Sequence, residues 1–215
     1  MAEIGGVLVV KPSQITGIDH ALVGVADLES ARLSYQKLGF TLTPRGRHIG
    51  WGTGNHTIMF ENDYVEMIAV IDRKQNTHNL EDFLQNGDGL FKVVLATNDA
   101  NATSTWIKKK SAKARDAQDL QRLLMINEKE ELLSFRYVHL PSELTPGLET
   151  FASQHLTPEK VRQPAWLSHP NGARGISEVT VVMEDLTDVA DSYAQIFASK
   201  SISGDERKGS ITVDT

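Results

Sequence analysis

The sequence predicts an α+β protein built from tandem βαβββ modules, in which a strand, a helix and three further strands follow one another. The first supporting observation is an apolar segment at 17–24 without helical periodicity, followed by a segment with apolar residues at helical spacing. The second is that this pattern recurs, closely from residue 175 and more faintly from residue 89. The chain has 215 residues, of which 40% are hydrophobic, so it is long enough to bury a core without disulfides.

The first module is predicted over residues 17–71 and begins with the strand IDHALVGV. Asp27 is a favourable N-cap for the following helix, and Gly39 stands where a left-handed C-cap residue belongs. Three short strands are expected next, at FTLTP, HTIMFE and YVEMIAVI, because clusters of turn-forming residues separate them.

A second module is predicted over residues 89–156, and part of a third over residues 175–215. In the second copy Asp99 takes the N-cap position, and Lys92 stands where the first copy has His20. Fewer residues follow position 175 than the first module uses. We therefore expect an unfinished third unit: either another chain completes its open edge, or the given sequence stops short of the end of the module.

Two further segments flank these modules. Residues 1–16 are predicted to be a leader or an edge strand. Residues 157–174 are rich in proline and glycine, but Trp166 and Leu167 provide apolar side chains to bury. This second segment is therefore predicted to be an ordered linker.

Composition narrows the classes of partner. A net charge of −6 disfavours nucleic acid and anionic membranes, which both require a basic surface. No stretch approaches the roughly 18 apolar residues of a membrane span, and the first residues lack the basic flank of a signal peptide. The absence of cysteine excludes thiolate metal sites and agrees with a reducing compartment. We expect a cytoplasmic protein whose partner is a small-molecule substrate.

Modules that open I-x-H-x-x-x-x-V-x-D-L and carry LGF after the helix resemble the vicinal-oxygen-chelate superfamily. This superfamily includes glyoxalases, extradiol dioxygenases, epimerases and antibiotic-resistance proteins. A narrower resemblance, to glyoxalase-like domains, rests on LGFTLTPRGRHIGWGTGNHTIMFENDYVEMIAV and QHLTPEKVRQPAWLSHPNGARGISEVTVV and extends over residues 17–197. The resemblance implies that the sheets of two modules curve into an open cup that holds a divalent metal.

The same resemblance implies His20 and Glu66 as metal ligands, from the first and last strands of the first module. An imidazole and a carboxylate suit borderline divalent metals such as Zn, Fe, Mn or Ni. Strand alternation directs both side chains toward mostly apolar faces, where an unpaired carboxylate is unfavourable. Glu66 therefore needs a metal, a cation or a proton, and it is also the candidate catalytic carboxylate.

A third ligand is expected from another module. If the first and second modules pair, His155 is the preferred residue; if the first and third pair, it is Glu178. Lys92 departs from the family pattern, because a protonated amine cannot bind a metal. The alternative is a hydrogen-bonded pair of His20 and Glu66 without metal, with His155 serving only to cap the linker.

Three residues are candidates for substrate binding. Asn55 and His56 lie in a glycine-rich segment expected at the rim of the cup, and Arg174 suits an anionic group of the substrate. Each also has a structural interpretation. Asn55 fits a turn, His56 fits the start of a strand, and the HPNG sequence before Arg174 fits a turn that leads into the third module.

These observations favour a metal-dependent enzyme of lyase, isomerase or dioxygenase type that acts on a small, vicinally oxygenated molecule. Such a metal polarises the vicinal oxygens, while a nearby base moves a proton. The alternatives are a non-catalytic ligand-binding protein of the resistance type and a degenerate structural paralogue. His20 with Glu66 favours the enzyme, whereas Lys92 favours the alternatives. A homodimer is expected, because modules of this class often pair between chains.

Overall fold

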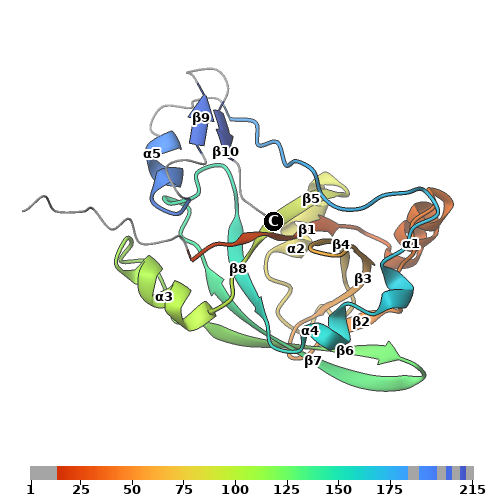
Figure 1. The fold of residues 1–215 in the computed structure, drawn as a ribbon. Helices are drawn as coiled ribbons and strands as arrows, with labels where there is room; N and C mark the ends of the chain where they lie inside the picture. Colours follow the sequence, from red (N-terminus) through yellow and green to blue (C-terminus); the bar gives the residue numbers. More distant parts are fainter. Residues whose placement is uncertain (1–13, 184–188, 198–201, 205–208, 212–215) are drawn as a thin grey trace, which may run out of the picture.

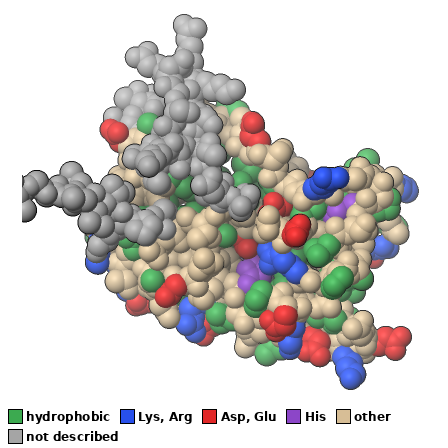
Figure 2. Space-filling model, in the orientation of Figure 1, with side chains coloured by type: hydrophobic (Ala, Val, Ile, Leu, Met, Phe, Trp, Pro, Cys, Tyr) green, Lys and Arg blue, Asp and Glu red, His purple; other side chains and the backbone are tan. Residues whose placement is uncertain are grey.

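The computed structural model describes residues 14–183, 189–197, 202–204 and 209–211. Most of the predicted leader or edge strand lies outside the described residues, and residues 14–16 form no strand. None of the helices in the described ranges is long and apolar enough to cross a membrane. On the face drawn in Figure 2, acidic and basic side chains are interspersed.

The strand–helix–three-strand order occurs twice (Figure 1). The first half contains β1 (Gly17–Gly24), α1 (Leu28–Lys37), β2 (Gly46–His48), β3 (Thr53–Met59) and β4 (Tyr64–Val70). The short helices α2 (Leu80–Phe83) and η1 (Leu84–Asn86) connect it to the second half. That half contains β5 (Gly89–Ala96), α3 (Ala100–Lys108), β6 (Gln118–Ile126), β7 (Lys129–His139) and β8 (Thr150–His155).

The eight strands of the two halves form one closed barrel in the order β1-β4-β3-β2-β6-β7-β8-β5. Within each half the first strand runs parallel to the last, as β1 does with β4 and β5 with β8. The halves join through two antiparallel pairs, β1 with β5 and β2 with β6. The predicted α+β fold is thus confirmed, with a sheet that curves into a barrel-like cup.

Local signals explain both long helices. The Asp27 carboxylate accepts a hydrogen bond from the Ser30 backbone N–H at the start of α1. Asp99 accepts the corresponding bond from Ala102 at the start of α3. Gly39, with φ of 83°, ends the first helix in the left-handed conformation, as predicted.

One predicted strand is displaced. The sequence FTLTP, residues 40–44, forms no strand, and β2 begins only at Gly46. The Thr41 backbone N–H donates to His169 Nδ1 in the linker. This backbone group is therefore satisfied by a residue far along the chain and not by a neighbouring strand.

The linker at 157–174 is ordered, and it contains α4 (Pro158–Val161) and η2 (Pro164–Trp166). Trp166 and Leu167 pack against an apolar cluster, as the sequence predicted. That cluster is formed by Met59, Tyr64, Leu124, Leu133, Phe135 and Val161.

The predicted first strand of a third module is not observed at residues 175–183, which form no strand and leave Val182 91% exposed. The barrel is already closed, so it has no free edge to which a further strand could pair. Helix α5 (Val189–Ala194) follows and places Tyr193 in the apolar cluster that contains Ile107. Strands β9 (Ile202–Gly204) and β10 (Gly209–Ile211) form a separate hairpin (Figure 1).

Two of the apolar clusters pack the long helices against the outside of the barrel. Leu28 of α1 lies in one cluster with Ile58 and Met67 of the first half. Ile107 of α3 lies in another with Leu95 of the second half. Because the helices cover the outer face, the inner face is left to line a cavity.

Candidate functional site

A cavity of about 400 Å³ lies inside the barrel. This volume is in the range of small-molecule binding sites. The polar residues of its wall include His20, His48, Glu66, Lys92 and Arg122. Aromatic rings form much of the remaining wall, and they belong to Trp51, Tyr64, Phe91, Phe135, Tyr137 and Phe151.

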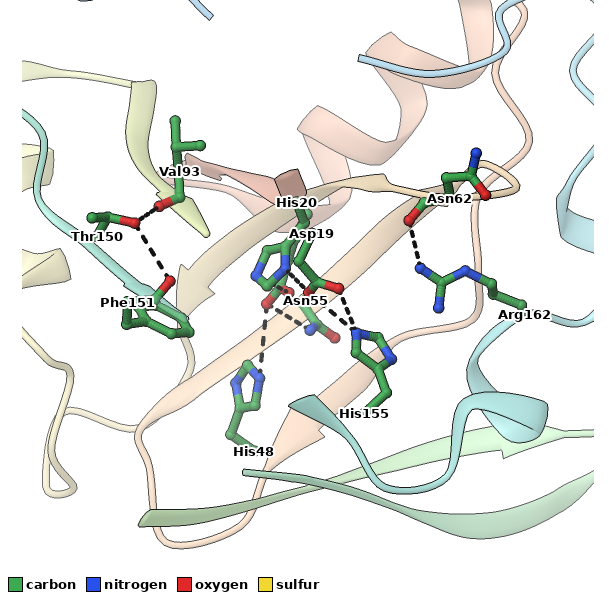
Figure 3. Close-up of polar contacts among 11 residues, drawn as sticks. Asp19, His20, His48, Asn55, Asn62, Val93, Thr150, Phe151, His155 and Arg162 are labelled. Atoms are coloured by element: carbon green, nitrogen blue, oxygen red, sulfur yellow. Dashed lines mark hydrogen bonds and ion pairs between the residues drawn. The ribbon is translucent and has the colours of Figure 1, made fainter. Parts of the chain in front are cut away.

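Two histidines face one buried carboxylate in this cavity. His20 Nε2 lies 3.7 Å from Glu66 Oε2, and His48 Nε2 lies 3.7 Å from Glu66 Oε1. Both separations exceed a good hydrogen bond, but they suit groups that bind one ion at about 2.0–2.2 Å each. Asn55 Nδ2 donates to Glu66 Oε1 at 2.8 Å and fixes the carboxylate (Figure 3).

Strand pairing brings these residues together. Tyr64 is the direct partner of His20 in the β1–β4 ladder, and their rings stack with centroids 4.3 Å apart. Glu66 follows two residues later on the same face of β4, in agreement with strand alternation. His48 ends β2, and its Nδ1 lies 2.9 Å from Thr53 Oγ1, which leaves Nε2 directed at Glu66.

Asp19 contacts the His20 ring nitrogen that faces away from Glu66. The register of β1 against β5 shifts between Ile18 and His20, so Asp19 is an additional residue in a β-bulge. The bulge allows two consecutive residues, Asp19 and His20, to be buried together. Asp19 Oδ2 is 2.6 Å from His20 Nδ1, and Asp19 Oδ1 is 2.8 Å from His155 Nε2 (Figure 3).

Burial and neighbouring charges set the ionisation of this group. Burial would raise the pKa of Asp19, but His155 and His20 hold that pKa well below its usual range. Burial also favours the acid form of Glu66, but the charges of His48, His20 and Arg122, together with the Asn55 hydrogen bond, leave its pKa lowered. Burial lowers the pKa of His48 to about 4. At neutral pH the site therefore presents an ionised Glu66 to a neutral His48.

The side chains of His20, His48 and Glu66 are of the types that bind divalent metals. They would have to move closer together to bind one ion. In the part of the chain that the structure describes, no group of three His, Asp or Glu side chains is arranged closely enough to hold a metal ion. The ionised Glu66 and the free Nε2 of His48 are suitable ligands. His20 has its Nδ1 engaged by Asp19, which is the carboxylate–histidine arrangement found behind metal-bound imidazoles.

The predicted third ligand lies elsewhere. His155 contacts Asp19 and the rings of Tyr64 and Phe135, and no contact with Glu66 is found in the described ranges. Glu178, the alternative third ligand, is exposed and accepts a hydrogen bond from Thr180. His155 and His20 therefore share the carboxylate of Asp19, and both also contact the Tyr64 ring.

The three predicted substrate-binding residues do not lie together in the structure. Asn55 contacts Glu66 rather than the open cavity. His56 has its Nδ1 2.8 Å from the Thr43 carbonyl oxygen and lines a different, shallow pocket. Arg174 is exposed and does not line the central cavity.

Sequence reasoning singled out His20 and Glu66 but gave no role to Asp19, His48 or Arg122. His48 was visible as a histidine in the glycine-rich segment. Arg122 had one signal in the sequence DLQRLLMI: at alternate positions it shares a face with Leu120 and Leu124, so a basic residue interrupts an apolar strand face.

Comparison with known proteins identifies the class of protein. Residues 18–197 match the family model described as a glyoxalase-like domain. This match spans most of the chain, so the chain belongs to the glyoxalase-like domain family, in the vicinal-oxygen-chelate superfamily that its motifs resemble. A search of curated proteins found no match.

Solved structures agree on the fold. A hypothetical protein from Staphylococcus aureus is similar with a TM-score of 0.53 and 17% identity, over 65% of this chain and 58% of that protein. A methylmalonyl-CoA epimerase in complex with methylmalonyl-CoA and NH4+ is similar with a TM-score of 0.50 and 18% identity, over 66% and 96% of the two chains. A variant of the Streptomyces coelicolor methylmalonyl-CoA epimerase in complex with 2-nitronate-propionyl-CoA has a TM-score of 0.50 and 17% identity, over 66% and 99%. At these identities the similarity concerns the fold alone.

Proposed function

We propose that this chain is a metal-dependent enzyme of the vicinal-oxygen-chelate type, in which His20, His48 and Glu66 hold a divalent cation. The observation that carries the proposal is that two imidazole Nε2 atoms each lie 3.7 Å from an oxygen of one ionised carboxylate in a cavity wall. The reaction classes that it includes are those of lyases, isomerases and dioxygenases. His48 takes the place that sequence analysis assigned to His155.

The protein groups around this site have distinct tasks. Glu66 supplies the negative charge, and Asn55 keeps its carboxylate oriented. Asp19 fixes the His20 ring so that Nε2 faces the cavity. When bound, a divalent cation supplies Lewis-acid polarisation of adjacent oxygens on a small molecule. The aromatic wall excludes water from that molecule.

A non-catalytic ligand-binding protein is the second candidate. The observation in its favour is Lys92, which lines the cavity and forms a 2.6 Å ion pair with Glu149 instead of offering a ligand. In that case the aromatic wall binds a ligand without a metal.

Metal analysis separates these functions and also tests the ligand set. We expect near-stoichiometric divalent metal in the purified wild type after equilibration with Zn, Mn, Fe or Ni salts, measured by plasma mass spectrometry. His48→Ala and Glu66→Gln should each weaken binding by at least about 100-fold, because each removes a direct ligand. His155→Gln is the matched control and should retain the metal.

The opposite pattern is equally informative. If His155→Gln loses the metal while His48→Ala keeps it, the ligand set is the one inferred from the sequence. If the folded wild type takes up no metal, the enzyme proposal fails and the binding-protein candidate takes its place. Circular dichroism of each variant ensures that a lost metal is not a lost fold.

A further inference from the structure

A buried arginine in the cavity wall has no hydrogen-bonded or ion-paired partner in the described part of the chain. Arg122 is 2% exposed, and its Nε is buried without a hydrogen bond. Across the residues that the structure describes, its guanidinium forms no hydrogen bond and no ion pair. Arg122 Cζ lies 5.7 Å from the centroid of the Phe135 ring. A buried guanidinium is normally paired, because removing it from water is costly.

The fold holds Arg122 in this position. It pairs directly with His48 across β2 and β6, so both side chains project from neighbouring strands into the same cavity. Gly46 makes the space for it, since a Cβ on Gly46 would lie 3.2 Å from Arg122 Cδ and 2.4 Å from Asn55 Oδ1. The guanidinium thus has a defined place close to the proposed metal ligands.

The other cations of the cavity differ from Arg122. Lys92 is neutralised by Glu149. Arg115 lines the cavity but is exposed to solvent, which can hydrate its charge. The charges of Arg122 and the ionised Glu66 attract each other, which helps to lower the pKa of Glu66, yet the two form no ion pair within 4.0 Å in the described part of the chain. Among the described cations of the cavity wall, Arg122 therefore combines deep burial with the lack of a hydrogen-bonded or ion-paired partner.

We propose that Arg122 is the receptor for a carboxylate of the substrate. Its planar fork of N–H donors matches a carboxylate in bidentate geometry. A single buried guanidinium suits a monoanion better than a phosphate dianion, which needs more positive charge. This inference rests on the proposed function and narrows its substrate to a small 2-hydroxy or 2-oxo acid. The carboxylate binds Arg122, the adjacent oxygen lies toward His20, His48 and Glu66, and the apolar substituent meets the aromatic wall.

Mandelate and its uncharged amide, mandelamide, provide a matched pair of probes. Both carry a hydroxyl next to the carbonyl carbon and an aromatic ring, and they differ in the charge that Arg122 would recognise. Calorimetric titration of metal-free wild-type protein should show mandelate binding about 10–100-fold more tightly than mandelamide, as expected for a charge-assisted pair. Mandelate should also raise the melting temperature more than mandelamide does.

Arg122→Met should abolish this preference, because Met fills the space without a charge. Arg122→Lys should keep part of it, since lysine retains the charge but lacks the fork. Arg136→Met is the control, because Arg136 lies on β7 of the same hairpin, pairs with Asp119 and does not line the cavity. This control should leave the preference unchanged.

Arg122→Met should also fold at least as stably as the wild type, because it removes an unpaired buried charge. A strongly destabilised Arg122→Met protein would instead assign the arginine a structural role and overturn the proposal. The same conclusion follows if the wild type binds the acid and the amide equally, or binds no mandelate at about 10 mM.

The two proposals fail separately. The titration uses metal-free protein, so a lost acid preference leaves the metal proposal standing. Conversely, a wild type that takes up no metal can still distinguish mandelate from mandelamide through Arg122.

Discussion

The two halves of the barrel share a backbone plan but differ in the side chains that they direct into the cavity. In the first half, His20 on β1 and Glu66 on β4 form a polar pair. In the second half, the corresponding places on β5 and β8 hold Lys92 and Phe151. At these corresponding places the first half thus has a histidine and a carboxylate, and the second half has an ion-paired lysine and an aromatic ring.

Strand register supports this correspondence. Leu22, two residues after His20, pairs with Glu66 in the parallel β1–β4 ladder. Val94, two residues after Lys92, pairs with Phe151 in the parallel β5–β8 ladder. A repeated backbone thus fixes where side chains point, but not which chemistry they bring. The cavity wall as a whole combines polar and apolar side chains, which suits a ligand with both characters.

The largest difference in unfolding free energy between matched variants of the two halves is expected at Asp19. Asp19→Asn removes a buried carboxylate that contacts both His20 and His155, and it should lower the free energy of unfolding by about 3–5 kcal/mol. Asp119→Asn, which breaks the exposed pair with Arg136 in the second half, should cost less than about 1 kcal/mol. Urea unfolding at neutral pH measures both, and similar losses in the two variants would contradict the comparison.

The pH dependence of stability tests the neutral state of His48. Its pKa is about 4 in the folded protein and near 6.5 when unfolded, so the unfolded chain binds the proton more tightly. The stabilisation is full above pH 6.5 and is lost as the pH falls toward 4. Between pH 6.5 and pH 5 this loss should reach about 2 kcal/mol.

His48→Gln should remove that part of the slope in urea unfolding at several pH values. The pKa values of His56, His78 and His139 are also lowered, mainly by burial, and these residues contribute in the same direction in both proteins. Asp19 changes the free energy of unfolding only at lower pH, because its pKa in the folded protein is lowered from 3.8. An unchanged slope in His48→Gln would show that this imidazole is not held neutral by burial.

The smallest effect is expected at the second-half counterpart of His20. Lys92→Met breaks a pair in which the Glu149 side chain is 53% exposed, so the cost should stay below about 1 kcal/mol. Metal affinity should not change, because Lys92 is not among the proposed ligands. A marked loss of metal in this variant would mean that the two halves share the site more evenly than their side chains indicate.

Much of the fold could be predicted because its signals are local. Asp27, Asp99 and Gly39 specify helix ends through hydrogen bonds and backbone angles within a few residues. The sequence-based prediction was wrong where strand pairing with distant residues decides the structure. The segment from Gly175 resembles the first strand, yet residues 175–183 find no strand partner because the barrel is closed. Whether an apolar segment becomes a strand depends on an available edge.

The sequence by itself determined the repeated helix and strand pattern and the burial of His20 and Glu66, because alternation and capping act over short distances along the chain. Only the tertiary structure decided which residues join them. The bulge in β1 contains Asp19, whose carboxylate contacts His155, and the pairing of β2 with β6 brings His48 beside Arg122. These contacts join residues far apart in the sequence, and they exist only once the barrel has closed.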